Sequence, residues 1–209
     1  MNEIVIQHIP ELAMAGALAW GAGLRLYLVT FLFGLAGAFG WWPLPEHLHV
    51  LQHPLVIGSA GFMAVIEMFA DKLPWLDSVW DAIHTFIRIP AGAALAAAVF
   101  GDSSLAITTA AALLGGSLTA TTHFTKSGTR AAANTSPEPF SNLALSFTED
   151  VAVVGGTWLA TQYPTTFLIA LVVFLILAII VFRLIVRGAR RLLRRLNGAP
   201  AAETGGIPG

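Results

Sequence analysis

The sequence contains no cysteine, and charged residues make up only 11% of its 209 residues. The absence of cysteine excludes disulfides, thiolate metal sites and cysteine nucleophiles. A soluble domain carries roughly a quarter charged residues, whereas 56% of this chain is hydrophobic and its mean hydropathy is +0.74. The formal net charge of −1 provides no general attraction to nucleic acid. The composition therefore predicts an integral membrane protein whose main partner is the lipid bilayer.

Basic residues are also missing from the first 24 positions, which carry two acids, Glu3 and Glu11. A cleaved signal peptide has a basic n-region, so none is expected here. At the other end, residues 197–209 are rich in Ala, Gly and Pro and are predicted to form a disordered tail. The remainder, residues 1–196, is predicted to be a single transmembrane domain.

Long apolar runs indicate an all-α, polytopic helix bundle, because a helix needs about 20 apolar residues to cross a bilayer. The last run, FLIALVVFLILAIIVF, is uninterrupted. About six spans are predicted, or five with a re-entrant segment. The six candidate spans are residues 11–39, 55–69, 87–100, 105–124, 143–159 and 165–186.

The distribution of Lys and Arg predicts the orientation. Arginines follow the last span in RLIVRGARRLLRRL, and such residues favour the cytoplasmic side. With six spans, the three loops on the other side (residues 40–54, 101–104 and 161–164) contain no Lys or Arg. We therefore expect a bacterial inner membrane protein with both termini in the cytoplasm.

The two halves of the chain, residues 10–101 and 105–187, share a sparse set of residues at constant offsets. With three predicted spans each, the second half would be inverted, as in many transporters that bind substrate between broken helices at the repeat interface. Chance similarity between two Gly- and Ala-rich segments explains the matches equally well. The matched pairs are Gly23/Gly128, Arg25/Arg130, Thr30/Thr135, Pro54/Pro137, Ser59/Asn142 and Glu67/Asp150.

Ionisable residues inside the predicted spans are the candidate functional residues, since each costs roughly 2.5–3.5 kcal/mol on insertion scales. Arg25 lies in the middle of the first span, and Glu67 and Asp71 are its nearest candidate partners. Carboxylate, hydroxyl and amide oxygens suit Na⁺, a divalent cation or H⁺ as a bound or transported ion. The alternative is a set of interhelical ion pairs that lock the bundle. The candidate ion-binding or substrate-binding residues are Arg25, Glu67, Asp71, Arg130, Asn142, Ser146, Glu149 and Asp150.

A second polar stripe lies in residues 75–87, where Asp77, Asp81 and His84 recur at helical spacing on one side. These three are candidate metal ligands, because histidine with carboxylates is a common ligand set. The favoured interpretation is the solvated face of an interfacial helix.

Four segments resemble a family of bacterial integral membrane proteins known as domain of unknown function 4126: GAGLRLYL, EMFADKLPWLDSVWDAIHTF, HTFIRIPAGA and NTSPEPFSNLALSFTED. The resemblance runs from about residue 15 to about residue 158. It implies a membrane location and no particular activity. The residues that match the family motifs are Arg25, Glu67, Asp71, Asp81, His84, Arg88, Lys126, Arg130, Asn134, Pro137, Glu138, Asn142, Glu149 and Asp150.

These patterns favour a transporter or channel for a small ion or solute over an enzyme. The first alternative is a metal-dependent membrane enzyme that acts on a lipid-linked substrate through Asp71, Asp77, Asp81 and His84. The second is a non-catalytic scaffold, because the small-residue runs AGAALAAA and AAALLGG allow close helix approach, including to a second copy of the chain.

Overall fold

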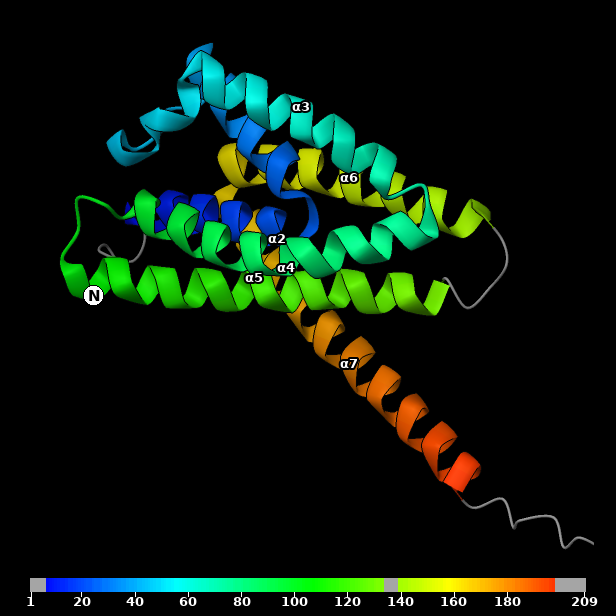
Figure 1. Ribbon diagram of the computed structural model, residues 1–209. Coiled ribbons are helices and arrows are strands. Elements are labelled where there is room, and N and C mark those ends of the chain that lie inside the picture. The colour runs from blue at the N-terminus through cyan, green and yellow to red at the C-terminus, as the bar shows by residue number, and fades with distance from the viewer. Residues whose placement is uncertain (1–6, 134–138, 198–209) are drawn as a thin grey trace, which may run out of the picture.

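The computed structural model describes residues 7–133 and 139–197, and the predicted tail from residue 198 onward lies outside this range, as do Asn134, Pro137 and Glu138. The described residues are helical with short connections, which confirms the all-α prediction for this part of the chain (Figure 1). The elements are α2 (Ile9–Ala38), the 3₁₀ helix η1 (Glu46–Gln52), α3 (Pro54–Ala70), α4 (Pro74–Val99), α5 (Leu105–Ala133), α6 (Pro139–Gln162) and α7 (Pro164–Asn197).

Proline marks the start of several helices. Pro10, Pro54 and Pro74 each occupy one of the first two positions of α2, α3 and α4. The missing N–H of proline is harmless in the first turn, where that donor has no partner within the helix, and its fixed φ suits helix entry. These prolines divide a nearly continuous apolar sequence into separate elements.

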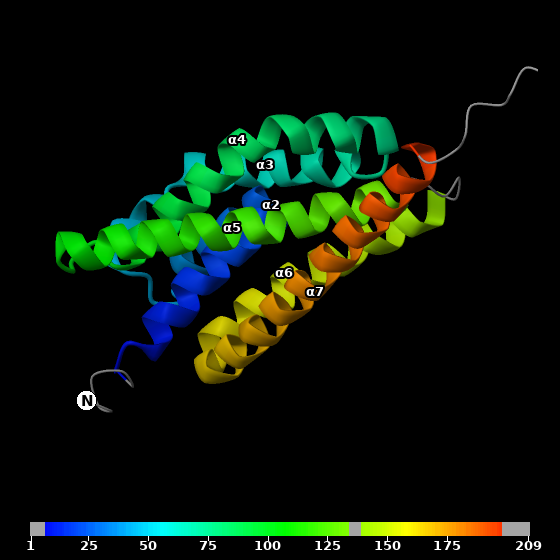
Figure 2. The same cartoon turned by 90° about the horizontal axis from the view of Figure 1, so that it is seen from below.

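Helix α2 reverses direction at Arg25. The φ and ψ angles of Arg25 are −146° and 76°, which are not helical. Gly21 and Val29 would lie about 12 Å apart along a straight helix, yet a Cβ added to Gly21 would be 2.8 Å from Val29 Cγ2. Figure 1 shows the second half of α2, in lighter blue, turning back at an angle to the first, and Figure 2 shows the dark blue first half from below, between α5 and the pair α6 and α7. The helix is therefore a hairpin with Arg25 at its tip.

The reversal places both ends of α2 at one end of the bundle. Pro10 and Trp41, which flank the two halves, line the same pocket as Gln162 at the α6–α7 connection. The arginines of α7 lie at the far end of that helix. The cytoplasmic location of both termini stays a prediction, whereas the reversal differs from the single crossing predicted at residues 11–39.

The α2 hairpin is the core of the bundle, and all the other helices pack against it. Its first half is nearly all buried and rich in alanine. Small residues also bring α4 and α5 together, since a Cβ on Gly92 would be 2.0 Å from Thr119 Oγ1. Close contact of this kind is how membrane helices gain packing energy without a hydrophobic driving force.

Within residues 7–133 and 139–197, four helices are long and apolar enough to cross a membrane, or five if η1 and α3, which meet at 65°, form one bent span. Only 6% of the most apolar window of α7 is buried. Apolar side chains of α7 such as Ile169, Val172 and Phe182 are instead exposed on the outside of the bundle, as expected of a face in contact with lipid. The chain is thus a helical protein with membrane character.

The predicted inverted repeat is not supported by the described residues. The first half contains the α2 hairpin, η1, α3 and α4, whereas the second contains only α5, α6 and α7. The two halves therefore do not share one order of elements. Six predicted spans are likewise not confirmed, although each predicted apolar run lies in a helix or extends one residue past its end.

Candidate functional site

A cluster of buried charged side chains surrounds the tip of the α2 hairpin. The Arg25 guanidinium is 2% exposed and forms an ion pair with Asp71, which follows α3. Its Nε lies 2.9 Å from Asp150 Oδ1 and 3.6 Å from Glu149 Oε2, both on α6. Its Nη2 donates to Ser146 Oγ at 2.7 Å. One side chain thus connects α2, α3 and α6.

The break in α2 also leaves a backbone carbonyl that can accept a hydrogen bond from a cationic side chain. Non-helical geometry at Arg25 removes the normal hydrogen bonding of the preceding turn, and Lys126 Nζ on α5 donates to Leu24 O at 3.0 Å. The same ammonium lies 3.5 Å from Asp71 Oδ2 and 3.4 Å from Glu149 Oε2. Lys126 therefore stabilises the reversal while pairing with two carboxylates.

Arg130, one turn further along α5, holds the cluster together at its other side. It donates to both oxygens of Glu149 at 3.1 and 2.8 Å, a bidentate geometry that suits guanidinium. It also lies 3.0 Å from Asp77 Oδ1 and 3.1 Å from Asp71 Oδ2. Arg25 and Arg130 therefore share Asp71 and Glu149.

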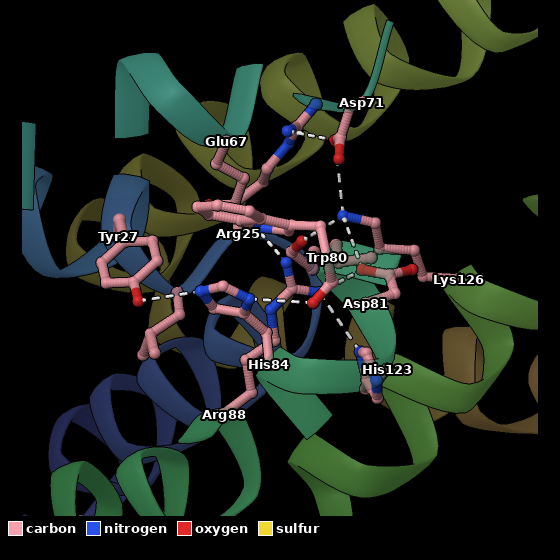
Figure 3. Close-up of polar contacts among 12 residues, drawn as sticks. Arg25, Tyr27, Glu67, Asp71, Trp80, Asp81, His84, Arg88, His123 and Lys126 are labelled. Carbon is pink, nitrogen blue, oxygen red and sulfur yellow. Dashed lines mark hydrogen bonds and ion pairs between the residues drawn. The ribbon is translucent and has the colours of Figure 1, made fainter. Parts of the chain in front are cut away.

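A second branch centres on Arg88 of α4, which is fully buried. It forms an ion pair with Glu67 of α3 and donates to Asp81 Oδ1 at 3.0 Å. Asp81 joins this branch to the first, since its Oδ1 lies 3.9 Å from Lys126 Nζ and its Oδ2 accepts from Ser127 at 3.1 Å. Figure 3 shows the two branches meeting around Lys126.

Two histidines border this network, and the partners of one of them, His123, determine its protonation. Arg88 can only donate, so the Nδ1 atom of His123, 3.2 Å away, must accept. His123 is therefore neutral, and its Nε2 donates to Thr85 Oγ1 at 2.7 Å. His84 differs, because its Nδ1 donates to Trp80 O at 2.8 Å and its Nε2 lies 3.1 Å from the Tyr27 hydroxyl (Figure 3).

Among the residues that the structure describes, the network contains more carboxylates than fixed cations. Its positive groups are Arg25, Arg88, Lys126 and Arg130, and its negative groups are Glu67, Asp71, Asp77, Asp81, Glu149 and Asp150. Six negative groups against four positive ones leave two unmatched charges when every carboxylate is ionised. An uncompensated buried charge costs several kcal/mol. The imbalance favours the neutral form of some of these carboxylates or pairing with a further cation.

Asp77 is a group where such a proton can reside, and it lies outside the apolar segment that starts at Val79. Burial raises the pKa of Asp77 to about 7, with Asp71 and Asp81 adding to the effect and Arg130 opposing it. Burial would also raise the pKa of Asp71, but Lys126, Arg25 and Arg130 together hold it below its usual range. The pKa values of these two neighbouring carboxyl groups are therefore shifted in opposite directions.

Two pockets reach the network from different sides. One, of about 270 Å³, lies between α4 and α5 and is lined by Asp77, Asp81, His123 and Arg130. The other, of about 320 Å³, is bounded by α2, α3 and α6 and ends on Arg25 and Asp150. The ion pairs from Asp77 through Arg130, Glu149 and Arg25 to Asp150 connect the two pockets.

The structure brings together the residues predicted as candidates for ion binding. Six of them belong to the network itself: Arg25, Glu67, Asp71, Arg130, Glu149 and Asp150. Ser146 contacts Arg25, and Asn142 is buried one turn before it on α6. Of the two partners predicted for Arg25, Asp71 forms the ion pair with it. The other, Glu67, pairs with Arg88 instead.

The prediction of a solvated interfacial face for Asp77, Asp81 and His84 is wrong. All three are buried, because this stripe faces α2, α3 and α5 and its charges are matched there. As metal ligands they are not grouped: each contacts a different partner. In the described ranges no group of three or more His, Asp or Glu is arranged to hold a metal ion.

Sequence reasoning left His123 and Lys126 out of the candidate site. A signal was present, since His123, Lys126 and Arg130 follow one another at intervals of three and four residues and so share one face of α5. No sequence pattern predicts that Lys126 binds the Leu24 carbonyl, because this oxygen can accept from Lys126 only where α2 reverses.

The family comparison agrees with this arrangement of motifs. The model of the family described as Domain of unknown function (DUF4126) matches residues 12–184. The chain belongs to this family. Searches of curated proteins and of solved structures gave no match. The matched range of this DUF4126 protein contains every charged residue of the network, and the family description assigns no activity.

Proposed function

We propose that this DUF4126 protein is a membrane transporter or channel for a small ion or solute, and that its buried network holds the ion or the protons that move with it. The observation that carries the proposal is the charge imbalance: six carboxylates and four fixed cations lie in one connected, buried cluster. Intramembrane charges of this kind are typical of substrate and proton pathways.

Access supports the proposal. The pockets beside Asp77 and beside Asp150 approach opposite ends of the same chain of ion pairs. If one side chain in this series of ion pairs exchanges its partner, the net charge next to each pocket changes. A purely structural set of ion pairs requires neither pocket nor an excess of one sign.

The proposed orientation places the arginines of α7 in the cytoplasm of a bacterial inner membrane. Lys72, Lys126 and Arg130 then lie toward the same side, while both ends of the α2 hairpin face outward. The sequence before Arg25 has no Lys or Arg, which fits this placement. The proposal does not require the inverted repeat, six spans or a second copy of the chain.

Flux in proteoliposomes tests the proposal. Purified protein is reconstituted with a pH-sensitive dye inside the vesicles, and proton and Na⁺ gradients are imposed in turn. We expect dissipation of a gradient by the unmodified chain and a loss of about tenfold or more in Glu67→Gln and Asp150→Asn. Asp102→Asn, an exposed carboxylate far from the network, is the matched control. Equal flux in all four proteins contradicts the proposal.

A further inference from the structure

The pocket between α3 and α6 combines an apolar wall with one accessible charge. Its apolar lining includes Leu28, Phe31, Val65 and Met68, and its polar end is formed by Arg25 and Asp150. Apart from these two, the residues lining it carry no charge. Small-molecule sites commonly have this composition, with few polar groups in an apolar cleft of roughly 300–1,000 Å³.

The accessible charge at the end of this pocket is negative. The Arg25 side chain is 2% exposed and its nitrogens face Asp71, Glu149, Asp150 and Ser146. The Asp150 side chain is 29% exposed, the highest value among the charged groups of the network. A ligand entering the pocket therefore meets a carboxylate before it meets the guanidinium.

We infer that this pocket binds a small organic cation, with its apolar body against α2 and α3 and its positive charge beside Asp150. The charge of the occupant follows from the network, which holds two more carboxylates than fixed cations. The apolar body follows from the lining, which provides few hydrogen-bonding groups for a hydrated inorganic ion. This inference rests on the proposed transport function and names its substrate class.

The route of entry is lateral. Phe62, Val65 and Val151 on the neighbouring faces of α3 and α6 are exposed and apolar. Exposed apolar faces of this kind suit contact with lipid, so an amphipathic cation that partitions into the membrane can reach the pocket from the side. A lipid acyl chain is the alternative occupant of the pocket. It carries no positive charge, so its binding would not depend on the Asp150 carboxylate.

Equilibrium binding of benzyltrimethylammonium to the purified full chain tests the inference, by titration calorimetry in detergent. Asp150→Asn removes the charge and keeps the shape, and Asp102→Asn is its control. Gly61→Leu fills the pocket, where a Cβ would contact Phe31 at 3.1 Å, and Gly58→Leu, one turn away in open space, is its control. Ala64→Leu fills the same pocket if the leucine at position 61 lowers the melting temperature.

We expect saturable binding that weakens by about tenfold or more in Asp150→Asn and in the pocket-filling variant, and that is unchanged in both controls. Equal affinity of the unmodified chain and of Asp150→Asn for the cation overturns the inference. A pocket that keeps bound lipid acyl chains and does not bind the cation also overturns it. Proton flux without cation binding also overturns it and leaves the transport proposal intact. Cation binding without any flux supports the cation site itself, and it contradicts transport and therefore the assignment of the cation as the transported substrate.

Discussion

Arg25 is stable in the membrane portion of the chain because carboxylates at the end of α3 and on α6 surround it. A guanidinium buried without them would cost several kcal/mol, and here Asp71, Glu149 and Asp150 surround it. Its planar fork reaches several oxygens at once, which the single ammonium of lysine does less well. The residue therefore fixes the position of the hairpin tip as well as the charge of the network.

Replacement of Arg25 tests this role. We expect Arg25→Gln to lower the free energy of unfolding by about 3–5 kcal/mol, because it leaves buried carboxylates unmatched. The double variant Arg25→Gln/Asp71→Asn should recover part of the loss, since it removes one of those carboxylates. Arg187→Gln, on an exposed part of α7, is the control. Denaturant unfolding in detergent measures the difference, and a loss in the control as large as in Arg25→Gln contradicts the account.

Asp77 gives the network a pH dependence of defined sign. Its pKa is raised to about 7 in the folded chain, so between about pH 4 and about pH 7 the folded state holds a proton that the unfolded state has released. Stability must therefore fall as the pH rises through that window. Asp71 acts in the opposite sense and only at lower pH, because its pKa is depressed and its stabilisation is lost on acidification.

The melting temperature measured from about pH 4.5 to about pH 7.5 checks this prediction. We expect it to decline with pH in the unmodified chain and to depend less on pH in Asp77→Asn. The exposed Asp102 again supplies the control, since Asp102→Asn should keep the original slope. A slope that is identical in Asp77→Asn would show that another group titrates.

At the scale of elements, the hairpin of α2 depends on close packing near its tip. A Cβ on Gly23 would lie 2.6 Å from the Thr119 carbonyl oxygen of α5, so only glycine fits without movement of backbone. We expect Gly23→Ala to destabilise the protein by about 1–3 kcal/mol through overpacking. Gly58→Ala, in open space on α3, should be neutral or slightly stabilising because alanine favours helix. Equal stability of the two variants contradicts the assigned packing.

Sequence patterns could predict the helices but only part of their arrangement. Each of the long helices in the described ranges contains one of the predicted apolar runs to within one residue, although the amphipathic stretch at residues 75–87 and the run at residues 87–100 belong to one helix, α4. The reversal of α2 was missed, because the apolar pattern continues through GAGLRLYL and only the glycines and Arg25 mark it. The polar stripe of α4 was misinterpreted for a different reason. An amphipathic pattern shows that one face is polar, and it does not show whether water or an opposite charge satisfies that face.

Part of the candidate site could be predicted because placing a charged side chain inside a membrane span costs free energy, so such residues need a specific role. That principle selected Arg25, Asp71 and Asp150 without knowledge of their contacts. It could not provide their pairing, since the partners of Arg25 lie up to 125 residues away and their approach depends on the α2 hairpin. The metal candidates on α4 do not group because Asp77 and Asp81 pair with different cations and His84 contacts Tyr27 of α2.

At the scale of the whole molecule, the hairpin predicts an orientation that labelling can check. The chain has no cysteine, so single substitutions report one position each. We expect a membrane-impermeant maleimide added outside intact cells to label His8→Cys and Asp102→Cys. Lys72→Cys should react only after permeabilisation. Protection of His8→Cys in intact cells, with labelling of Asp102→Cys, would contradict the reversal of α2.

The most direct test of the central claim is to remove the charge imbalance while leaving the fold intact. Asp77→Asn/Asp150→Asn reduces the six carboxylates to four, which matches the four fixed cations. If the excess charge serves ion movement, this variant keeps or exceeds the melting temperature of the unmodified chain and loses gradient-driven flux in proteoliposomes. Unmodified flux in the folded, charge-balanced variant would contradict the account.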